Sequence, residues 1–273
     1  MLRGFYTAAS GMLTQQRKTE MLANNMANVH TPGFKADQSS LRAFPEMLLR
    51  RFDQDENSIG TTTKTIGSLN TGVYMQEAQP KFRQGDIKET NLSTDVALLD
   101  VNLPTDPETG LPSAVFFTVE NGNGETRCTR NGNFTLDGTG YLTTASGLYL
   151  LDQQGNRIQL SSEQFSINEE GYLTGSNGET PRLGVSYSDN PMGMVKEGDG
   201  LFRAENTELV DAYNVNGVQF KTQQGYLEQS NVDAAQTMTA MMTAYRTFEA
   251  NQKILQAYDT SLQKTVNEVG KIG

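Results

Sequence analysis

The sequence predicts an α+β protein with a long helix at each end and an all-β centre. Residues 232–269 carry apolar side chains at alternating spacings of three and four, the heptad pattern of a helix that buries one stripe against a partner helix. Residues 2–29 show a weaker helical face. Between about 75 and 230, β-rich stretches alternate with tight-turn signals. We therefore expect two coiled-coil helices forming a discontinuous helical domain, and a central sandwich or partly open barrel.

The N-terminal helix is expected to be weak in isolation. Its apolar face includes Leu2, Ala9, Met12 and Leu13. Gly4 and Gly11 each cost about 1 kcal/mol relative to Ala in a helix interior. The small residues at 8–11 would let another helix approach closely. The helix should end at Thr31-Pro32-Gly33, because proline disfavours helical geometry in the residue before it and glycine accepts a turn.

The C-terminal helix carries the clearer pattern. Its stripe consists of Met238, Met241, Tyr245, Phe248, Gln252, Leu255, Asp259, Leu262, Val266 and Val269. Only Gln252 and Asp259 interrupt its apolar character. Polar residues at such positions cost stability but fix register and partner, so the pattern favours specific assembly.

The middle of the chain is predicted to consist of short strands. Residues 114–120 are β-rich, and Asn131-Gly132 is a strong hairpin signal. A strand-turn-strand frame occurs at 134–142 and 165–173, with a shorter echo at 220–227. The spacing of these repeats is too irregular for a solenoid.

Residues 35–75 differ from both regions. Pro45–Phe52 could form a short helix, whereas residues 53–68 are polar and Thr-rich. Such a segment has few residues for a core and should become ordered only against its neighbours. The expected organisation is a terminal helical domain of residues 1–30 and 232–273, a flexible linking segment at 31–75, and a β-rich outer domain at 76–231.

Composition excludes several classes of protein. The 273 residues contain 36% hydrophobic residues, no run of about 18 apolar residues, and no apolar segment followed by a cleavage site for a secretion signal. Cys128 is the single cysteine, so an intramolecular disulfide is excluded. The net charge of −10 lies almost entirely in the middle segment, because residues 61–232 carry 11 Lys/Arg against 22 Asp/Glu. No basic stripe supports nucleic-acid binding.

Catalytic and cofactor signals are weak. His30 is the single histidine, and no G-x-S-x-G motif accompanies it. Asp137–Gly140 and Asp152–Asn156 resemble calcium loops only loosely and are better explained as tight turns. Glu169-Glu170 falls at a hairpin tip, where a solvated turn explains the pair better than a glycosidase acid. We expect no enzyme, no cofactor, no metal and no small-molecule substrate.

Two terminal motifs resemble a known family. The N-terminal motif comprises Tyr6–Met12, Leu22–Asn28 and Thr31–Lys35, and the C-terminal motif comprises Gly225–Asp233 with Met241, Tyr245-Arg246, Phe248–Asn251 and Asp259. Both resemble signatures of the flagellar basal-body rod and hook proteins. Thr237, Ala244 and the long turn Pro104–Pro112 depart from the family pattern, which leaves the position within the rod open.

The resemblance implies a structural subunit of the flagellar basal body. It implies export through the flagellar type III apparatus, helical polymerisation with copies of itself and other rod or hook subunits, and terminal helices that form an inner tube. The expected assembly interface consists of Leu2, Ala9, Met12, Leu13, Asn24, Asn25, Asn28, Phe34, Met238, Met241, Tyr245, Arg246, Phe248, Glu249, Asn251, Gln252, Leu255, Asp259, Leu262 and Val266. The three asparagines are expected to hydrogen-bond across subunits, with plain solvent exposure as the alternative.

Other interpretations remain open at this point. The two helices could pair within one monomer, because a heptad stripe is satisfied equally by an internal partner. A hook-type or other extracellular axial subunit fits the same motifs. A surface adhesin would also explain the β domain but should carry a secretion signal, and a hydrolase would require convergent acid and base groups.

Overall fold

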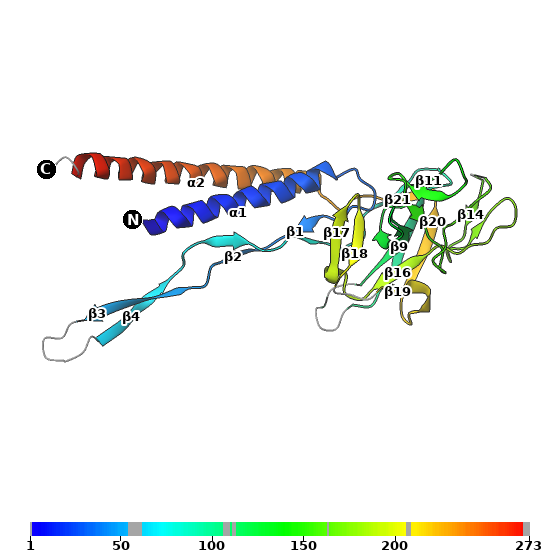
Figure 1. The fold of residues 1–273 in the computed structure, drawn as a ribbon, viewed down its shortest axis with the longest axis horizontal. Helices are drawn as coiled ribbons and strands as arrows, with labels where there is room; N and C mark the ends of the chain where they lie inside the picture. Colours follow the sequence, from blue (N-terminus) through cyan, green and yellow to red (C-terminus); the bar gives the residue numbers. More distant parts are fainter. Residues whose placement is uncertain are drawn as a thin grey trace. The chain divides into compact units, whose positions relative to one another are not determined.

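A helix stands at each end of the chain, with a β-rich region between (Figure 1). The computed structural model describes residues 2–53, 62–105, 110, 113–162, 164–205 and 209–269, with the backbone alone at 2, 51–53, 62–64 and 269. The predicted mixed α+β architecture is confirmed. The chain divides into two compact units. Unit 1 contains Met1–Met26, Asp37–Gln79 and Ala234–Gly273, and unit 2 contains Ala27–Ala36 and Pro80–Asp233.

Unit 1 contains both helices. Helix α1 spans Leu2–Ala27 and α2 spans Ala234–Val269, each within two residues of the predicted ends. They lie side by side and run in opposite directions (Figure 1). Neither helix is long and apolar enough, over its described residues, to cross a membrane.

The strands of segment 37–80 form three pairs, of which β2–β5 and β3–β4 are antiparallel. These are β1 (Asp37–Gln38) with β6 (Gln79–Pro80), β2 (Leu41–Ala43) with β5 (Val73–Met75), and β3 (Met47–Asp53) with β4 (Thr62–Leu69). The predicted short helix at Pro45–Phe52 is therefore wrong. Long-range pairing with β4 satisfies the backbone of β3, and a local propensity cannot reveal such a partner. The expectation that 31–75 becomes ordered on assembly remains a prediction, and its residues 54–61 lie outside the described residues.

Unit 2 is built on a nine-stranded sheet, counted over the described residues. Its main path is β11 (Phe134–Leu136), β12 (Leu142–Thr144), β13 (Tyr149–Leu150), β9 (Ala114–Glu120), β10 (Thr126–Thr129), β18 (Leu201–Ala204) and β17 (Met194–Gly198). Strand β16 (Val185–Ser188) pairs with β9 and with β19 (Val210–Asp211). Because β9 has neighbours on both edges and packing on both faces, its sequence is an almost continuous apolar run.

Alternate side chains of β9 enter two different cores. Val115, Phe117 and Val119 belong to the larger core, which extends over β11 to β16. Phe116 belongs to the smaller core, where its ring lies 5.6 Å from that of Phe202. This division follows from the two-residue period of a strand.

The remaining elements of unit 2 are short. They are the strand pairs β7 (Ile87–Glu89) with β21 (Tyr226–Glu228), β8 (Val96–Asn102) with β20 (Gln219–Gln224) and β14 (Ser166–Ile167) with β15 (Leu173–Thr174), and the 3-10 turns η1 (Pro191–Gly193) and η2 (Ala212–Asn214). Two sequence predictions fail here. Asn131-Gly132 is not a hairpin turn, because β10 pairs with β9 and β18 while β11 pairs with β12. Residues 220–227 form no hairpin either, because β20 and β21 pair with different strands.

The repeated hairpin frame is confirmed at its first two positions. Asp137 and Asn168 each accept hydrogen bonds from the backbone N–H groups two and four residues later. Gly140 and Gly171 follow in both turns with φ of +85° and +83°. An Asx turn closed by a left-handed glycine thus joins β11 to β12 and β14 to β15.

Candidate assembly surface

Three hydroxyl groups fix the β2–β5 segment on α1. Thr7, Ser10 and Thr14 are spaced at i, i+3 and i+7, so they lie on one face of the helix. The Oγ1 of Thr7 donates to the Thr71 carbonyl at 3.1 Å, and that of Thr14 donates to the Val73 carbonyl at 3.1 Å. The Val73 N–H donates to the Ser10 Oγ at 3.4 Å. The chain entering β5 is therefore held at three successive points.

Gly72 allows this close approach. A Cβ at residue 72 would come within 2.3 Å of the Ser10 Oγ and 3.1 Å of the Phe44 ring. A further anchor lies at the other end of α1, where the Asn25 amide donates to the Asp37 carbonyl at 2.8 Å and accepts from the Asp37 N–H at 2.9 Å. Segment 37–79 is thus bonded to α1 at both ends of the helix.

Helix α2 contacts α1 at two glycines. A Cβ on Gly4 would lie 2.1 Å from the hydroxyl oxygen of Tyr258, and a Cβ on Gly11 would lie 3.0 Å from the Asn251 Nδ2. From the first contact to the second, α1 advances seven residues, from Gly4 to Gly11, while α2 goes back seven, from Tyr258 to Asn251. The two helices therefore pack antiparallel. The small residues predicted to admit a close helix therefore do so at Gly11, within the same chain.

Burial along α2 follows a regular pattern. Eight buried or half-buried positions alternate spacings of four and three, namely Thr237, Met241, Ala244, Phe248, Asn251, Leu255, Tyr258 and Leu262, and Ala240 beside them is half-buried as well. This pattern shares Met241, Phe248, Leu255 and Leu262 with the predicted stripe. Five other predicted positions are exposed, namely Met238, Tyr245, Gln252, Asp259 and Val266, and the side chain of the last one, Val269, lies outside the described part. Gln252 and Asp259 therefore lie outside the face that is buried within the single chain, and their role in setting the register of assembly stays a prediction.

Residue size explains the difference at two positions. Ala244 is only 2% exposed, and Thr237 only 9%, yet neither is a large apolar residue. Each precedes a large, exposed apolar residue, Tyr245 or Met238, by one position. A search for large apolar side chains therefore selects the exposed neighbour at these two positions.

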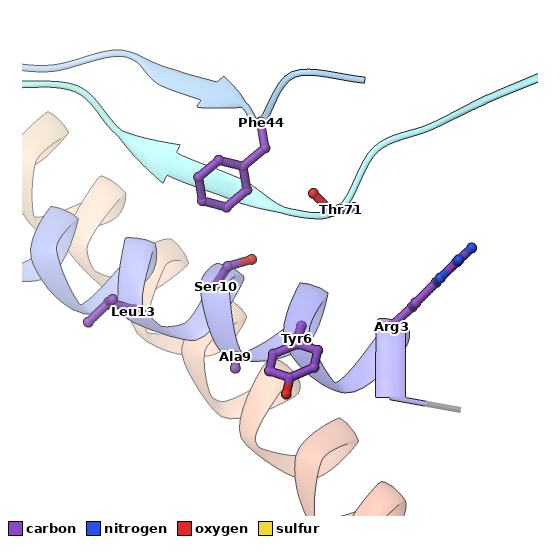
Figure 2. A pocket seen from close by; sticks show the side chains of 7 residues that line it. All are labelled: Arg3, Tyr6, Ala9, Ser10, Leu13, Phe44 and Thr71. Atoms are coloured by element: carbon purple, nitrogen blue, oxygen red, sulfur yellow. The ribbon is translucent and has the colours of Figure 1, made fainter. Parts of the chain in front are cut away.

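An open groove lies on α1 beside the β2–β5 segment (Figure 2). The α1 groove has a volume of about 480 Å³ and is lined by Arg3, Tyr6, Ala9, Ser10, Leu13, Phe44 and Thr71. Figure 2 shows the Phe44 ring projecting from the end of β2 towards the helix, with Arg3 at the N-terminal end of α1. Tyr6 is 63% exposed and Leu13 50% exposed, so large apolar side chains of this groove face solvent.

Helix α2 also exposes apolar side chains. Met238, Met242 and Tyr245 lie at i, i+4 and i+7, and they are 55%, 49% and 56% exposed. We call these three residues the α2 outer stripe. Arg246 and Glu249 are exposed as well. Unit 1 thus presents two apolar surfaces, one on each helix.

The remaining predicted interface residues have varied surroundings. Met12 is half-buried and Asn24 is exposed, whereas the Leu2 side chain lies outside the described part. Asn25 is buried, and its hydrogen bonds lie within the chain, contrary to the expected bonds across subunits. In unit 2, Asn28 accepts from the Thr31 hydroxyl, and the buried Phe34 ring lies 3.9 Å from the Lys196 ammonium.

Unit 2 contains a buried cluster of charges that the sequence did not reveal. Glu228 forms ion pairs with Lys35 at 2.5 Å and with Arg130 at 2.7 Å, and all three side chains are at most 3% exposed. Arg130 also pairs with Asp100 at 2.9 Å and donates to the Val115 carbonyl. The Gly85 N–H donates to the same Glu228 oxygen that binds Lys35. We call Lys35, Asp100, Arg130 and Glu228 the Glu228 cluster.

The cluster shifts the pKa values of its members. Burial and the charge of Arg130 lower the pKa of Lys35 to about 8, against the opposing effect of Glu228. Burial would raise the pKa of the Glu228 carboxyl, but the charges of Arg130 and Lys35 hold it below its ordinary value. Lys35 and Glu228 are therefore both charged at neutral pH, so their ion pair is formed there.

The described residues offer no group of three or more His, Cys, Asp or Glu side chains able to hold a metal ion. His30 is exposed beyond the end of α1, and Cys128 is buried in the smaller core. What the arrangement does offer is apolar surface on two helices and a rigid attachment of β5 to one of them.

Sequence reasoning missed several of these residues. Thr7 and Thr14 are seven residues apart, and so are Asn251 and Tyr258. A search for polar residues that repeat every seven positions would have found these four residues. No local signal identifies Glu228 as the partner of Lys35, 193 residues earlier.

Three family models match the chain. A model described as flagella basal body rod protein matches residues 5–35. One described as flagellar hook protein FlgE/F/G D1 domain matches 114–175, and one described as flagellar basal body rod FlgEFG protein C-terminal matches 223–268. The first and third cover most of α1 and of α2, and the second covers the centre of the large sheet.

Individual proteins are similar over the whole length. The flagellar hook-basal body complex protein FlhO of Bacillus subtilis is 42% identical over 100% of both chains. The flagellar basal-body rod protein FlgG of Bacillus subtilis is 30% identical over 98% of this chain and 99% of its own, and FlgG of Borreliella burgdorferi is 31% identical over 96% and 97%.

Proposed function

Because the chain belongs to the flagellar basal-body rod protein family, whose members are structural proteins of the basal body and not enzymes, we propose that it is a subunit of the rod itself. In this role it polymerises helically through its terminal helices and transmits torque between motor and hook. Export through the flagellar type III apparatus belongs to the same proposal and delivers the chain beyond the cytoplasmic membrane.

The observation that carries this proposal is the exposed apolar surface on both helices of unit 1. Tyr6 and Leu13 on α1, and Met238 and Tyr245 on α2, are each at least half exposed. Two such surfaces on different helices of one subunit support association with further copies. A contact between two different surfaces that does not close into a ring generates a helical filament.

The proposal assigns a part to each region of the chain. Residues 1–30 and 232–273 pair as coiled-coil helices and form the inner tube, and the β-rich residues 76–231 form the outer layer. Residues 31–75 become fully ordered on assembly. The exposed β3–β4 ribbon supports the last point, because Leu48 and Ile66 are 62% and 66% exposed and an isolated two-stranded ribbon is marginally stable in water.

The test is removal of either helix in cells. Deleting residues 2–28, or truncating the chain after Val232, should abolish its recovery in purified basal bodies and abolish motility. The truncation retains Glu228, so the Glu228 cluster keeps all four members. Circular dichroism of the purified variants should show that the β-rich region remains folded.

A full-length chain with the same affinity tag is the matched control. It should co-purify with basal bodies and restore motility to a strain that lacks the gene. Recovery of either helix-deleted chain in basal bodies at the control level would contradict the proposal, as would absence of the full-length chain from them. Detection of the tagged full-length chain in the hook instead of the basal body would favour the hook-type alternative.

A further inference from the structure

The α1 groove is a preformed surface. Thr7, Ser10 and Thr14 hold the chain on one side of it through hydrogen bonds to Thr71 and Val73. The groove therefore does not depend on an occupant to define its walls. Its exposed apolar side chains, Tyr6, Leu13 and Phe44, are 63%, 50% and 39% exposed. Burying them against another apolar surface would be favourable.

The chain carries a surface of matching dimensions. Tyr6 and Leu13 are seven residues apart on α1, and Met238 and Tyr245 are seven residues apart on α2, so each pair spans about 10 Å at 1.5 Å per residue. Methionine adapts readily to an irregular apolar surface, and two of the three side chains of the α2 outer stripe are methionines. Within the same chain the stripe is about half exposed, whereas the glycines of α1 face Asn251 and Tyr258.

Direction and charge select one alignment. In each copy α1 and α2 are antiparallel, as the contacts of Gly4 with Tyr258 and Gly11 with Asn251 require. Copies in a head-to-tail filament share one polarity, so with both helices along its axis, α1 of one copy meets α2 of another in antiparallel orientation. In this orientation Tyr245 can lie beside Tyr6 while Met238 lies beside Leu13. Glu249 is one helical turn beyond Tyr245, and Arg3 is about one turn beyond Tyr6, so the alignment brings Glu249 to Arg3.

We propose that the α1 groove receives the α2 outer stripe of a second copy of this chain, with Glu249 of that copy against Arg3. The proposal rests on the proposed function, since it takes the filament polarity from it. The second copy keeps its own α1 groove free for a third. Each α1 is therefore contacted by two α2 helices, one from its own chain at the glycines and one from the next copy at the groove.

Crosslinking in isolated basal bodies tests the contact directly. Ala9→Cys combined with Met242→Cys should give covalent dimers and higher multiples of the chain on mild oxidation. Within one chain Gly11 meets Asn251, so residue 242 lies more than two turns of α2 away from residue 9 and an internal link is not expected. The matched control is Ala9→Cys with Thr247→Cys, because Thr247 is also exposed but lies on the other side of α2.

Charge reversal provides a second test. Arg3→Glu and Glu249→Arg should each lower recovery of the chain in basal bodies about tenfold, because a like-charge contact weakens the interface. The double variant Arg3→Glu/Glu249→Arg should return to within about twofold of the unaltered chain, since it restores opposite charges. Circular dichroism of each purified variant checks that α1 and α2 remain helical.

The outcomes separate this inference from the proposed function. If the unaltered chain is recovered in basal bodies but the Ala9/Met242 cysteine pair forms no multiples, or the double charge variant is not rescued, the docking contact is wrong and the rod function stands. A crosslink to a protein of different mass would also overturn it, because the occupant would not be a second copy. If the unaltered chain is absent from basal bodies, both proposals fail.

Discussion

Lys35 and Glu228 form a 2.5 Å ion pair in which both side chains are at most 3% exposed. Lys35 lies just after the turn that follows α1, and Glu228 ends the last strand before α2. Arg130, from the centre of unit 2, binds the second oxygen of the same carboxylate. The Glu228 cluster therefore joins the beginning, the middle and the end of unit 2.

Replacing Glu228 with glutamine should destabilise unit 2. Lys35 and Arg130 would remain buried with Asp100 as the single carboxylate partner, and breaking a buried pair costs about 3–5 kcal/mol. The measurement is urea denaturation followed by circular dichroism. Glu169→Gln is the control. Glu169 pairs with Lys221 at the surface, where their side chains are 71% and 51% exposed, so this pair should contribute at most about 1 kcal/mol to stability. Equal stability of the two variants would contradict the role given to the cluster.

The cluster predicts how stability depends on pH. The pKa of Glu228 is lowered on folding, so its contribution is present above its ordinary pKa of 4.5 and is lost as the pH falls through the folded value. The pKa of Lys35 is lowered from 10.5 to about 8 in the folded chain. Between these two pH values the folded chain binds fewer protons at Lys35 than the unfolded chain does, so the free energy of unfolding rises with pH. Lys35→Met should flatten this alkaline rise, whereas Lys221→Met should not. Parallel profiles for both variants would be evidence against the shift at Lys35.

Replacing Gly72 with alanine should loosen the β2–β5 segment from α1. The new Cβ would fall within 2.3 Å of the Ser10 Oγ, so the hydrogen bond from Val73 to Ser10 should be lost. Limited proteolysis should cleave the Gly72→Ala chain faster within segment 37–79. Gly67→Ala is the matched control in the same segment, because a Cβ there has open space. Identical cleavage rates would show that Gly72 is not needed for the approach.

Gly4→Ala should weaken the contact between the helices. Alanine favours an isolated helix by about 1 kcal/mol, but its Cβ would lie 2.1 Å from the Tyr258 hydroxyl oxygen. We expect the helical signal at 222 nm to melt at a lower temperature, and Gly4→Ala/Tyr258→Ala to melt no lower than Tyr258→Ala alone. A higher melting temperature for Gly4→Ala would mean that helix propensity outweighs the contact.

Cys128 should be unreactive in the folded protein. Burial raises the pKa of its thiol to about 12, so almost no thiolate exists at pH 8. A thiol reagent such as Ellman's reagent should label it only when unit 2 unfolds, with a denaturant midpoint equal to that from circular dichroism. Rapid labelling without denaturant would show that the smaller core opens in the native state.

The extent of sequence-based prediction differed between the units. Both helices were predicted to within two residues because helical periodicity is a local property of the chain. The turns at Gly140 and Gly171 were predicted because an Asx residue and a left-handed glycine define them locally. The hairpin that the sequence predicts at Asn131-Gly132 does not form. Gly132 instead allows close approach to the Val96 carbonyl, which a Cβ would reach at 1.7 Å.

The sequence by itself determined the two terminal helices, the β-rich centre and, through its terminal motifs, the family resemblance. The tertiary structure decided which face of α2 contacts α1, placing Asn251 and Tyr258 against the two α1 glycines and leaving Gln252 and Asp259 of the predicted stripe exposed. It also decided that β3 is a strand and that Glu228 meets Lys35. The physical reason is common to all three: local backbone preferences extend over a few residues, whereas close packing, strand pairing and charge compensation depend on partners distant in the chain.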